Sequence, residues 1–129
     1  MSYTKHRANE SLEDYLETIL ILHKTKGQVR SIDIANAMNF TKASVSVAMK
    51  NLREKKYITM ADTGHITLTE SGRQRAEGVL ERHTLLSDWL ISIGVSKETA
   101  LEDACRIEHD LSDESFEAIK KLTRLSQSD

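Results

Sequence analysis

Residues 31–69 read SIDIANAMNFTKASVSVAMKNLREKKYITMADTGHITLT, and the architecture of the chain follows from this stretch. Its apolar residues first recur at three- and four-residue steps, which predicts a short helix that ends near Asn39 and a second helix that begins at Thr41. Between residues 57 and 69 the period changes to two, around a turn at residues 62–64. The stretch therefore predicts two helices followed by a small β-hairpin.

Longer helical patterns flank this stretch on both sides. An apolar stripe that starts at Ser11 stops at Gly27, and another runs from Thr69 to Gly94, where a glycine is expected after a helix end. Two further helices are expected at residues 97–110 and 113–125. Residues with side-chain oxygens stand at the expected helix starts: Ser31, Thr41, Thr69, Ser96 and Ser112. The predicted fold class is mainly α with one small β-hairpin.

The order of these elements is that of a winged helix-turn-helix, whose third helix enters the major groove of DNA. The formal net charge of −2 argues against a uniformly basic surface, but the charge is unevenly divided. Residues 1–82 hold 13 Lys and Arg against 10 Asp and Glu, whereas residues 83–129 hold 5 against 10. We therefore expect a winged helix-turn-helix DNA-binding domain at residues 1–72 and a helical domain at residues 73–129.

The third helix offers basic and hydroxyl side chains, which bind phosphates and base edges. The candidate DNA contacts are Thr41, Lys42, Ser44, Ser46 and Lys50. A solvated helix face is the alternative interpretation, but the hairpin directly after the helix favours DNA. No bidentate Asn, Gln or Arg stands out at the front of the helix, so the bases that it reads stay open. Ala43 and Val47 could contact thymine methyls, or contact nothing.

Several polar residues lie on or near apolar helix faces. Asp14 and Glu17 are three residues apart in the first helix, so their carboxylates can lie close together. Asp14 has an alternative role, because Ser11-x-x-Asp14 resembles a capping box, and Glu17 could be a surface acid. His83 lies inside the apolar stripe of the fourth helix, where a histidine can also be an ordinary core residue.

The fifth helix carries the more specific pattern, Cys105-x-x-Glu108-His109. This spacing lets one helical turn present a thiol, a carboxylate and an imidazole to a single point. Burying such groups is expensive unless something neutralises them, and a divalent transition metal does so. With Asp14, Glu17 and His83, the set predicts a metal site whose donors come from three helices.

Composition excludes several other classes. No apolar run approaches a membrane span, and the N-terminus is polar, so a cytoplasmic protein without membrane contact is expected. The single cysteine cannot form an internal disulfide. No phosphate loop or nucleophile elbow accompanies the candidate ligands, so we do not expect an enzyme, although an open metal position could activate water.

Three segments carry a family resemblance: SLEDYLE at residues 11–17, RHTLL at residues 82–86 and DACRIEHDLSDE at residues 103–114. They resemble the iron- and manganese-dependent repressor family (the DtxR/MntR family), in its short form without the SH3-like domain. The resemblance implies a homodimer in which a winged helix-turn-helix precedes a helical metal-binding and dimerisation region. It also implies that a bound metal activates operator binding and so represses metal-uptake genes.

The same resemblance assigns roles to the candidate ligands. Asp14 and Glu17 match the first-helix ligands of the manganese branch, and His83 matches a histidine that both branches share. Glu108 and His109 match the Glu-His pair of the last site helix, whereas Cys105 resembles the iron branch. The expected cofactor is iron (Fe2+) or manganese (Mn2+), with zinc (Zn2+) and cobalt (Co2+) as further candidates. The alternative function is a winged-helix regulator that responds to an organic ligand or to oxidation of Cys105.

Overall fold

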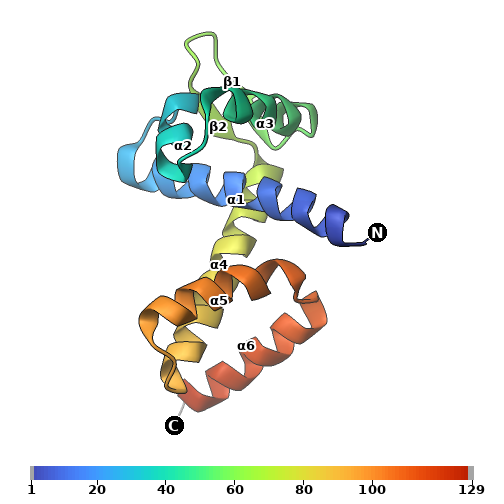
Figure 1. Cartoon of the computed structure of the whole chain (residues 1–129), viewed down its shortest axis with the longest axis vertical. Helices are drawn as coiled ribbons and strands as arrows, with labels where there is room; N and C mark the ends of the chain where they lie inside the picture. The colour runs from blue at the N-terminus through green and yellow to red at the C-terminus, as the bar shows by residue number, and fades with distance from the viewer. Residues whose placement is uncertain (1, 128–129) are drawn as a thin grey trace. The chain divides into compact units, whose positions relative to one another are not determined.

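The computed structural model describes the backbone of residues 2–127 and the side chains of residues 12–124. The chain forms two compact units, residues 1–78 and residues 79–129. The elements of the first unit are α1 (Ser2–Lys26), α2 (Ser31–Met38), α3 (Lys42–Glu54), β1 (Ile58–Met60) and β2 (Ile66–Leu68). α4 (Glu70–Ser92) contributes residues to both units, and α5 (Lys97–Asp110) and α6 (Asp113–Gln127) belong to the second. The mainly α fold with one hairpin is confirmed (Figure 1).

α1 is the support on which the rest of the first unit packs, since α2, α3 and β2 all contact it (Figure 1). Each of the three helices buries apolar residues at the helical spacing. The fully buried large side chains among them are Leu16, Ile19, Ile34, Val45, Met49 and Leu52. Burying a side chain of this kind contributes about 1.5–3 kcal/mol. The buried apolar stripe of α3 therefore determines which face of this helix is exposed to solvent.

β1 and β2 form an antiparallel hairpin, in which Ile58 pairs with Leu68 and Met60 pairs with Ile66. Gly64 adopts a φ of +89° in the turn, a conformation that side chains disfavour. The hairpin is also joined to the loop after α1, because the Ile66 N–H donates to the carbonyl oxygen of Val29 at 2.7 Å. The hairpin is thus held from a second side, as a wing attached to the helical body.

Four of the five expected helix starts are confirmed. Side-chain oxygens of Thr41, Thr69, Ser96 and Ser112 each accept a hydrogen bond from the backbone N–H three residues later. The prediction for Ser31 is wrong, because α2 begins at Ser31 and its N-cap is Arg30. The Asp33 carboxylate accepts from the Arg30 N–H at 2.9 Å and so replaces a serine cap.

The start of α1 also differs from the expectation. The helix begins at Ser2, so Ser11 lies inside it and the capping-box interpretation of Asp14 is wrong. Residues 2–10 are mostly polar and carry no apolar stripe, which is why periodicity alone predicts the helix only from residue 11.

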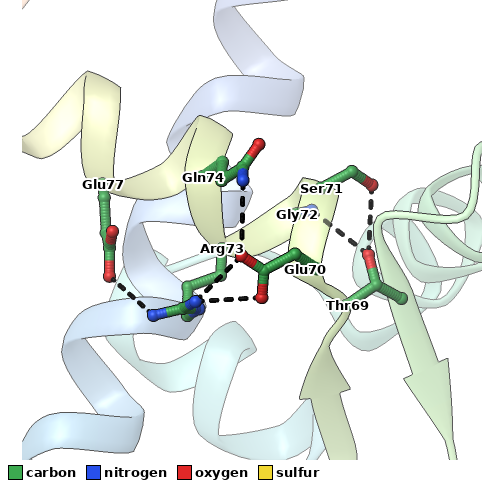
Figure 2. A network of polar contacts seen from close by, with 7 residues as sticks. All are labelled: Thr69, Glu70, Ser71, Gly72, Arg73, Gln74 and Glu77. Carbon is green, nitrogen blue, oxygen red and sulfur yellow. Dashed lines mark hydrogen bonds and ion pairs between the residues drawn. The ribbon is translucent and has the colours of Figure 1, made fainter.

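α4 begins with a dense set of polar contacts, which Figure 2 shows. Thr69 Oγ1 accepts a hydrogen bond from the Gly72 N–H at 3.1 Å. Glu70 receives two hydrogen bonds from the Arg73 guanidinium, and these hold the pKa of the Glu70 carboxyl below its usual value. The N–H of Thr69 also donates to the carbonyl oxygen of Tyr57, so the same residue connects α4 to the start of the wing.

The second unit has a small core built from α4, α5 and α6. Its buried apolar residues are Val79, Leu86, Ala100, Ala104 and Phe116. The alanines of α5 allow the close packing that a short helix with few large apolar residues needs. Among the described residues, no helix has the length and apolar character that crossing a membrane requires.

Candidate metal centre and nucleic-acid interface

The candidate metal centre is built first from one turn of α5. The donor atoms of Cys105, Glu108 and His109 lie within 4.8 Å of one another. Two ligands of one transition-metal ion, each about 2.0–2.3 Å from it, lie at most about 4.6 Å apart. The three donors therefore need only small shifts to share an ion, and thiolate, carboxylate and imidazole are a set that Fe2+, Co2+ and Zn2+ accept.

The Glu108 carboxylate is the centre of this group. Its residue is only 2% exposed, and its Oε2 lies 2.9 Å from Nδ1 of His83 on α4. Its other oxygen, Oε1, lies 3.3 Å from Nε2 of His109. One buried carboxylate thus contacts two imidazoles that come from different helices. The structure brings together the four ligand candidates of the second unit, of which Cys105 is exposed.

Arg82 holds the end of α5 that carries these donors. Its Nη1 donates to the carbonyl oxygens of Glu108 at 3.0 Å and Leu111 at 2.6 Å. Its Nη2 pairs with the carboxylate of Asp113, the first residue of α6. Sequence reasoning did not find this role, because carbonyl partners 26 and 29 residues away leave no pattern in the sequence. Arg82 therefore fixes the position of Glu108 through its backbone.

Asp14 and Glu17 belong to the first unit. They lie one turn apart on α1, and both are partly buried. Because α1 continues on both sides of them, neither carboxylate has a helix N-terminus to cap. Their local structure thus leaves open the role as ligands that the sequence predicts.

The candidate nucleic-acid interface is the outward face of α3. Lys42, Ser46 and Lys50 are exposed there, opposite the buried stripe of the helix. Thr41 and Ser44 are exposed as well, but they are engaged in the N-cap. Thr41 Oγ1 accepts from the Ser44 N–H at 3.1 Å and donates to Ser44 Oγ at 2.9 Å. Two of the five candidate contacts therefore have a structural role in starting the helix.

Comparisons with known families match both units. Residues 8–66 match the family described as iron dependent repressor, N-terminal DNA binding domain. Residues 69–129 match the family described as iron dependent repressor, metal binding and dimerisation domain. The two matches together cover most of the chain.

Individual relatives agree with these matches. The helix-turn-helix regulator MntR of Geobacillus kaustophilus is 36% identical over 119 residues, covering 92% of this chain and 84% of that protein. An uncharacterized regulator of Methanocaldococcus jannaschii is 33% identical over 114 residues, covering 87% and 91%.

Solved structures are similar as well. The structure of IdeR from T. acidophilum has a TM-score of 0.70 at 29% identity, and covers 86% of this chain. A manganese-dependent transcriptional repressor in complex with manganese has a TM-score of 0.77 at 26% identity, and covers 85%. This chain spans about half the length of those two proteins, 53% and 51% respectively.

Proposed function

The chain belongs to the iron-dependent repressor family, and we propose that it is a transcriptional repressor whose binding to a DNA operator depends on a divalent transition metal. The observation that carries the proposal is the buried Glu108 carboxylate between His83 and His109, next to the Cys105 thiol. Residues 1–72 bind DNA in this proposal, and residues 73–129 bind metal and form a homodimer. Two half-sites of a palindromic operator would match the two-fold axis of such a dimer.

The proposed ligands are His83, Cys105, Glu108 and His109, with Asp14 and Glu17 completing the set. A divalent cation would offset the negative charge of the three carboxylates. Because Asp14 and Glu17 lie on the helix that supports α3, ligation by them would couple metal binding to the DNA-binding unit. Coupling of this kind is reciprocal, so operator binding would also tighten metal binding.

Cys105 governs the choice of metal in this proposal. Thiolate is a soft ligand that matches Fe2+, Co2+ and Zn2+ better than Mn2+. We therefore propose that Fe2+ binds more tightly than Mn2+. Replacing Cys105 by serine should weaken Zn2+ and Co2+ binding more than Mn2+ binding.

The proposed DNA contacts lie on α3. Lys42 and Lys50 would neutralise phosphates, and Ser46 would donate to a phosphate or a base edge. Thr41 and Ser44 would contact DNA from within the N-cap that they form. Each phosphate that a lysine neutralises contributes about 0.9 to the slope of log affinity against log salt concentration.

The test is operator binding with and without metal. A DNA duplex is selected from a random library by the full chain with Mn2+ or, under anaerobic conditions, Fe2+, and its affinity is then measured by fluorescence anisotropy. We expect the affinity to fall about 5- to 150-fold in chelator, as a coupling of about 1–3 kcal/mol implies. Glu108→Gln should abolish the metal response, whereas Glu102→Gln, an exposed acid on the same helix, should keep it.

Other outcomes would contradict parts of the proposal. Equal affinity with metal and with chelator would refute the metal switch but not DNA binding. A Cys105→Ser protein that still binds metal tightly and loses only its response to peroxide would favour the thiol-oxidation alternative. We further propose that the chain is not an enzyme and acts in the cytoplasm, because the matched family consists of DNA-binding regulators.

A further inference from the structure

Two aliphatic side chains lie on the outward face of α3. Val45, Met49 and Leu52 are buried and define the inward face of the helix. Val47 points away from them and is 63% exposed, the largest exposed fraction among the large hydrophobic residues described. Ala43, four residues earlier and also exposed, extends the same apolar stripe.

Neither packing nor helix propensity explains Val47. It is too exposed to contribute much to the core. As a β-branched residue it also loses side-chain freedom in a helix and disfavours the helix by about 0.5 kcal/mol relative to alanine. An exposed helix position that served stability alone would favour Ala, Glu or Lys. The valine therefore points to a contact outside the unit.

The chemistry around Val47 identifies that contact. Residues 42–56 carry Lys42, Lys50, Arg53, Lys55 and Lys56 against Glu54, a net charge of +4. Such a surface attracts phosphate, not a second apolar protein face. The first two turns of α3, residues 42–49, contain no Asn, Gln or Arg, so they offer no bidentate amide or guanidinium contact to a base. The only apolar group on a base edge in the major groove is the C5-methyl of thymine.

We propose that Val47, with Ala43 beside it, reads thymine by packing against its C5-methyl group in each operator half-site. The inference rests on the proposed function, because it assumes that α3 enters the major groove of an operator. It makes Val47 a specificity-determining residue, whereas Lys42 and Lys50 supply affinity without sequence information.

The experiment removes only the methyl groups. In the duplex selected in the test above, each thymine is replaced in turn by deoxyuridine, which keeps every hydrogen-bonding group of thymine. Binding of the metal-loaded full chain is then measured for the wild type, Val47→Ala and Ile32→Ala. Ile32 is the matched control, because it is an exposed aliphatic residue on α2 of the same unit.

We expect one thymine position per half-site at which replacement by deoxyuridine weakens wild-type binding. Loss of one buried methyl group predicts a decrease of about fourfold when one half-site is changed, and of about 15-fold when both half-sites are changed. Val47→Ala should lose this penalty, and Ile32→Ala should keep it. A penalty that persists in Val47→Ala, or no thymine whose methyl matters, overturns the inference. Failure of the wild type to select any duplex with metal overturns the proposed function itself, so the two failures are distinguishable.

Discussion

Replacing Gly72 by alanine should destabilise the protein, although alanine is the better helix former. Gly72 lies in the first turn of α4, directly against the backbone of Tyr57. A Cβ added to Gly72 would lie 1.9 Å from the Tyr57 carbonyl oxygen and 2.8 Å from its carbonyl carbon, where 3.4–4 Å is ordinary contact. Both atoms belong to the backbone, so no side-chain rotation relieves the clash.

The magnitude follows from what must move. Separating the two backbones disturbs the hydrogen bond from the Thr69 N–H to the Tyr57 carbonyl oxygen, now 2.9 Å, and this bond contributes about 1 kcal/mol. Overpacking destabilises the folded state by a further amount of about 1–3 kcal/mol. The better helix propensity of alanine offsets about 1 kcal/mol of this loss. The net loss in the free energy of unfolding is therefore about 1–3 kcal/mol. The hydrogen bond from the Gly72 N–H to Thr69 Oγ1, drawn in Figure 2, lies in the same turn and would be disturbed as well.

Gly78 is the matched control, because it lies in the same helix with nothing within 4 Å of an added Cβ. Gly78→Ala should raise the free energy of unfolding by about 0.5–1 kcal/mol. Both variants are unfolded in urea with chelator present, so that bound metal does not contribute to stability. If Gly72→Ala unfolds at the same or a higher urea concentration than the wild type, with an unchanged slope, the steric argument is wrong.

Two further predictions concern charged side chains. Asp33→Asn should lower the free energy of unfolding by about 0.5–1 kcal/mol at pH 7, because Lys26 lies 2.6 Å from the Asp33 carboxylate and, with a backbone N–H, holds its pKa below the usual value. Since the folded-state pKa is the lower one, this advantage is present above about pH 4 and lost in stronger acid, where the urea curves of the two proteins should converge. Arg82→Lys should cost about 1–3 kcal/mol, because an ammonium group cannot replace the guanidinium bonds to two carbonyl oxygens and a carboxylate. It should also weaken Zn2+ binding, measured by competition with a chelating dye, and unchanged stability and affinity would contradict the role assigned to Arg82.

The parts of the structure that the sequence predicted are those in which local geometry decides the outcome. α5 has the predicted bounds, residues 97–110, because Ser96 caps it and the stripe within it has one period. The proximity of Cys105, Glu108 and His109 follows in the same way, since residues three and four apart in a helix share one face. Neither feature depends on packing between distant residues.

The parts that the sequence did not predict depend on contacts between distant residues. His23 is an example, because its Nδ1 lies 2.9 Å from the Gly27 carbonyl oxygen and its Nε2 lies 2.9 Å from that of Ile66. The second contact spans 43 residues, and nothing in the spacing of the sequence indicates it. The bridge between Val29 and Ile66 was missed for the same reason. Where the wing attaches is therefore decided by packing, not by periodicity.

The distribution of charge connects the two proposed activities. Residues 83–129 carry 10 acidic against 5 basic side chains, and DNA phosphates would repel a segment of this charge. The acids that the proposal places on the metal, Asp14, Glu17 and Glu108, are the ones that a bound cation would offset. The chain has a formal net charge of −2 with Cys105 counted as a neutral thiol, so one divalent ion bound with a Cys105 thiolate would bring each subunit to about −1, while the +4 segment at residues 42–56 stays unchanged. In this proposal, ligation of the α1 residues and removal of negative charge both strengthen operator binding, and the buried Glu108 carboxylate on α5 binds the ion that has both effects.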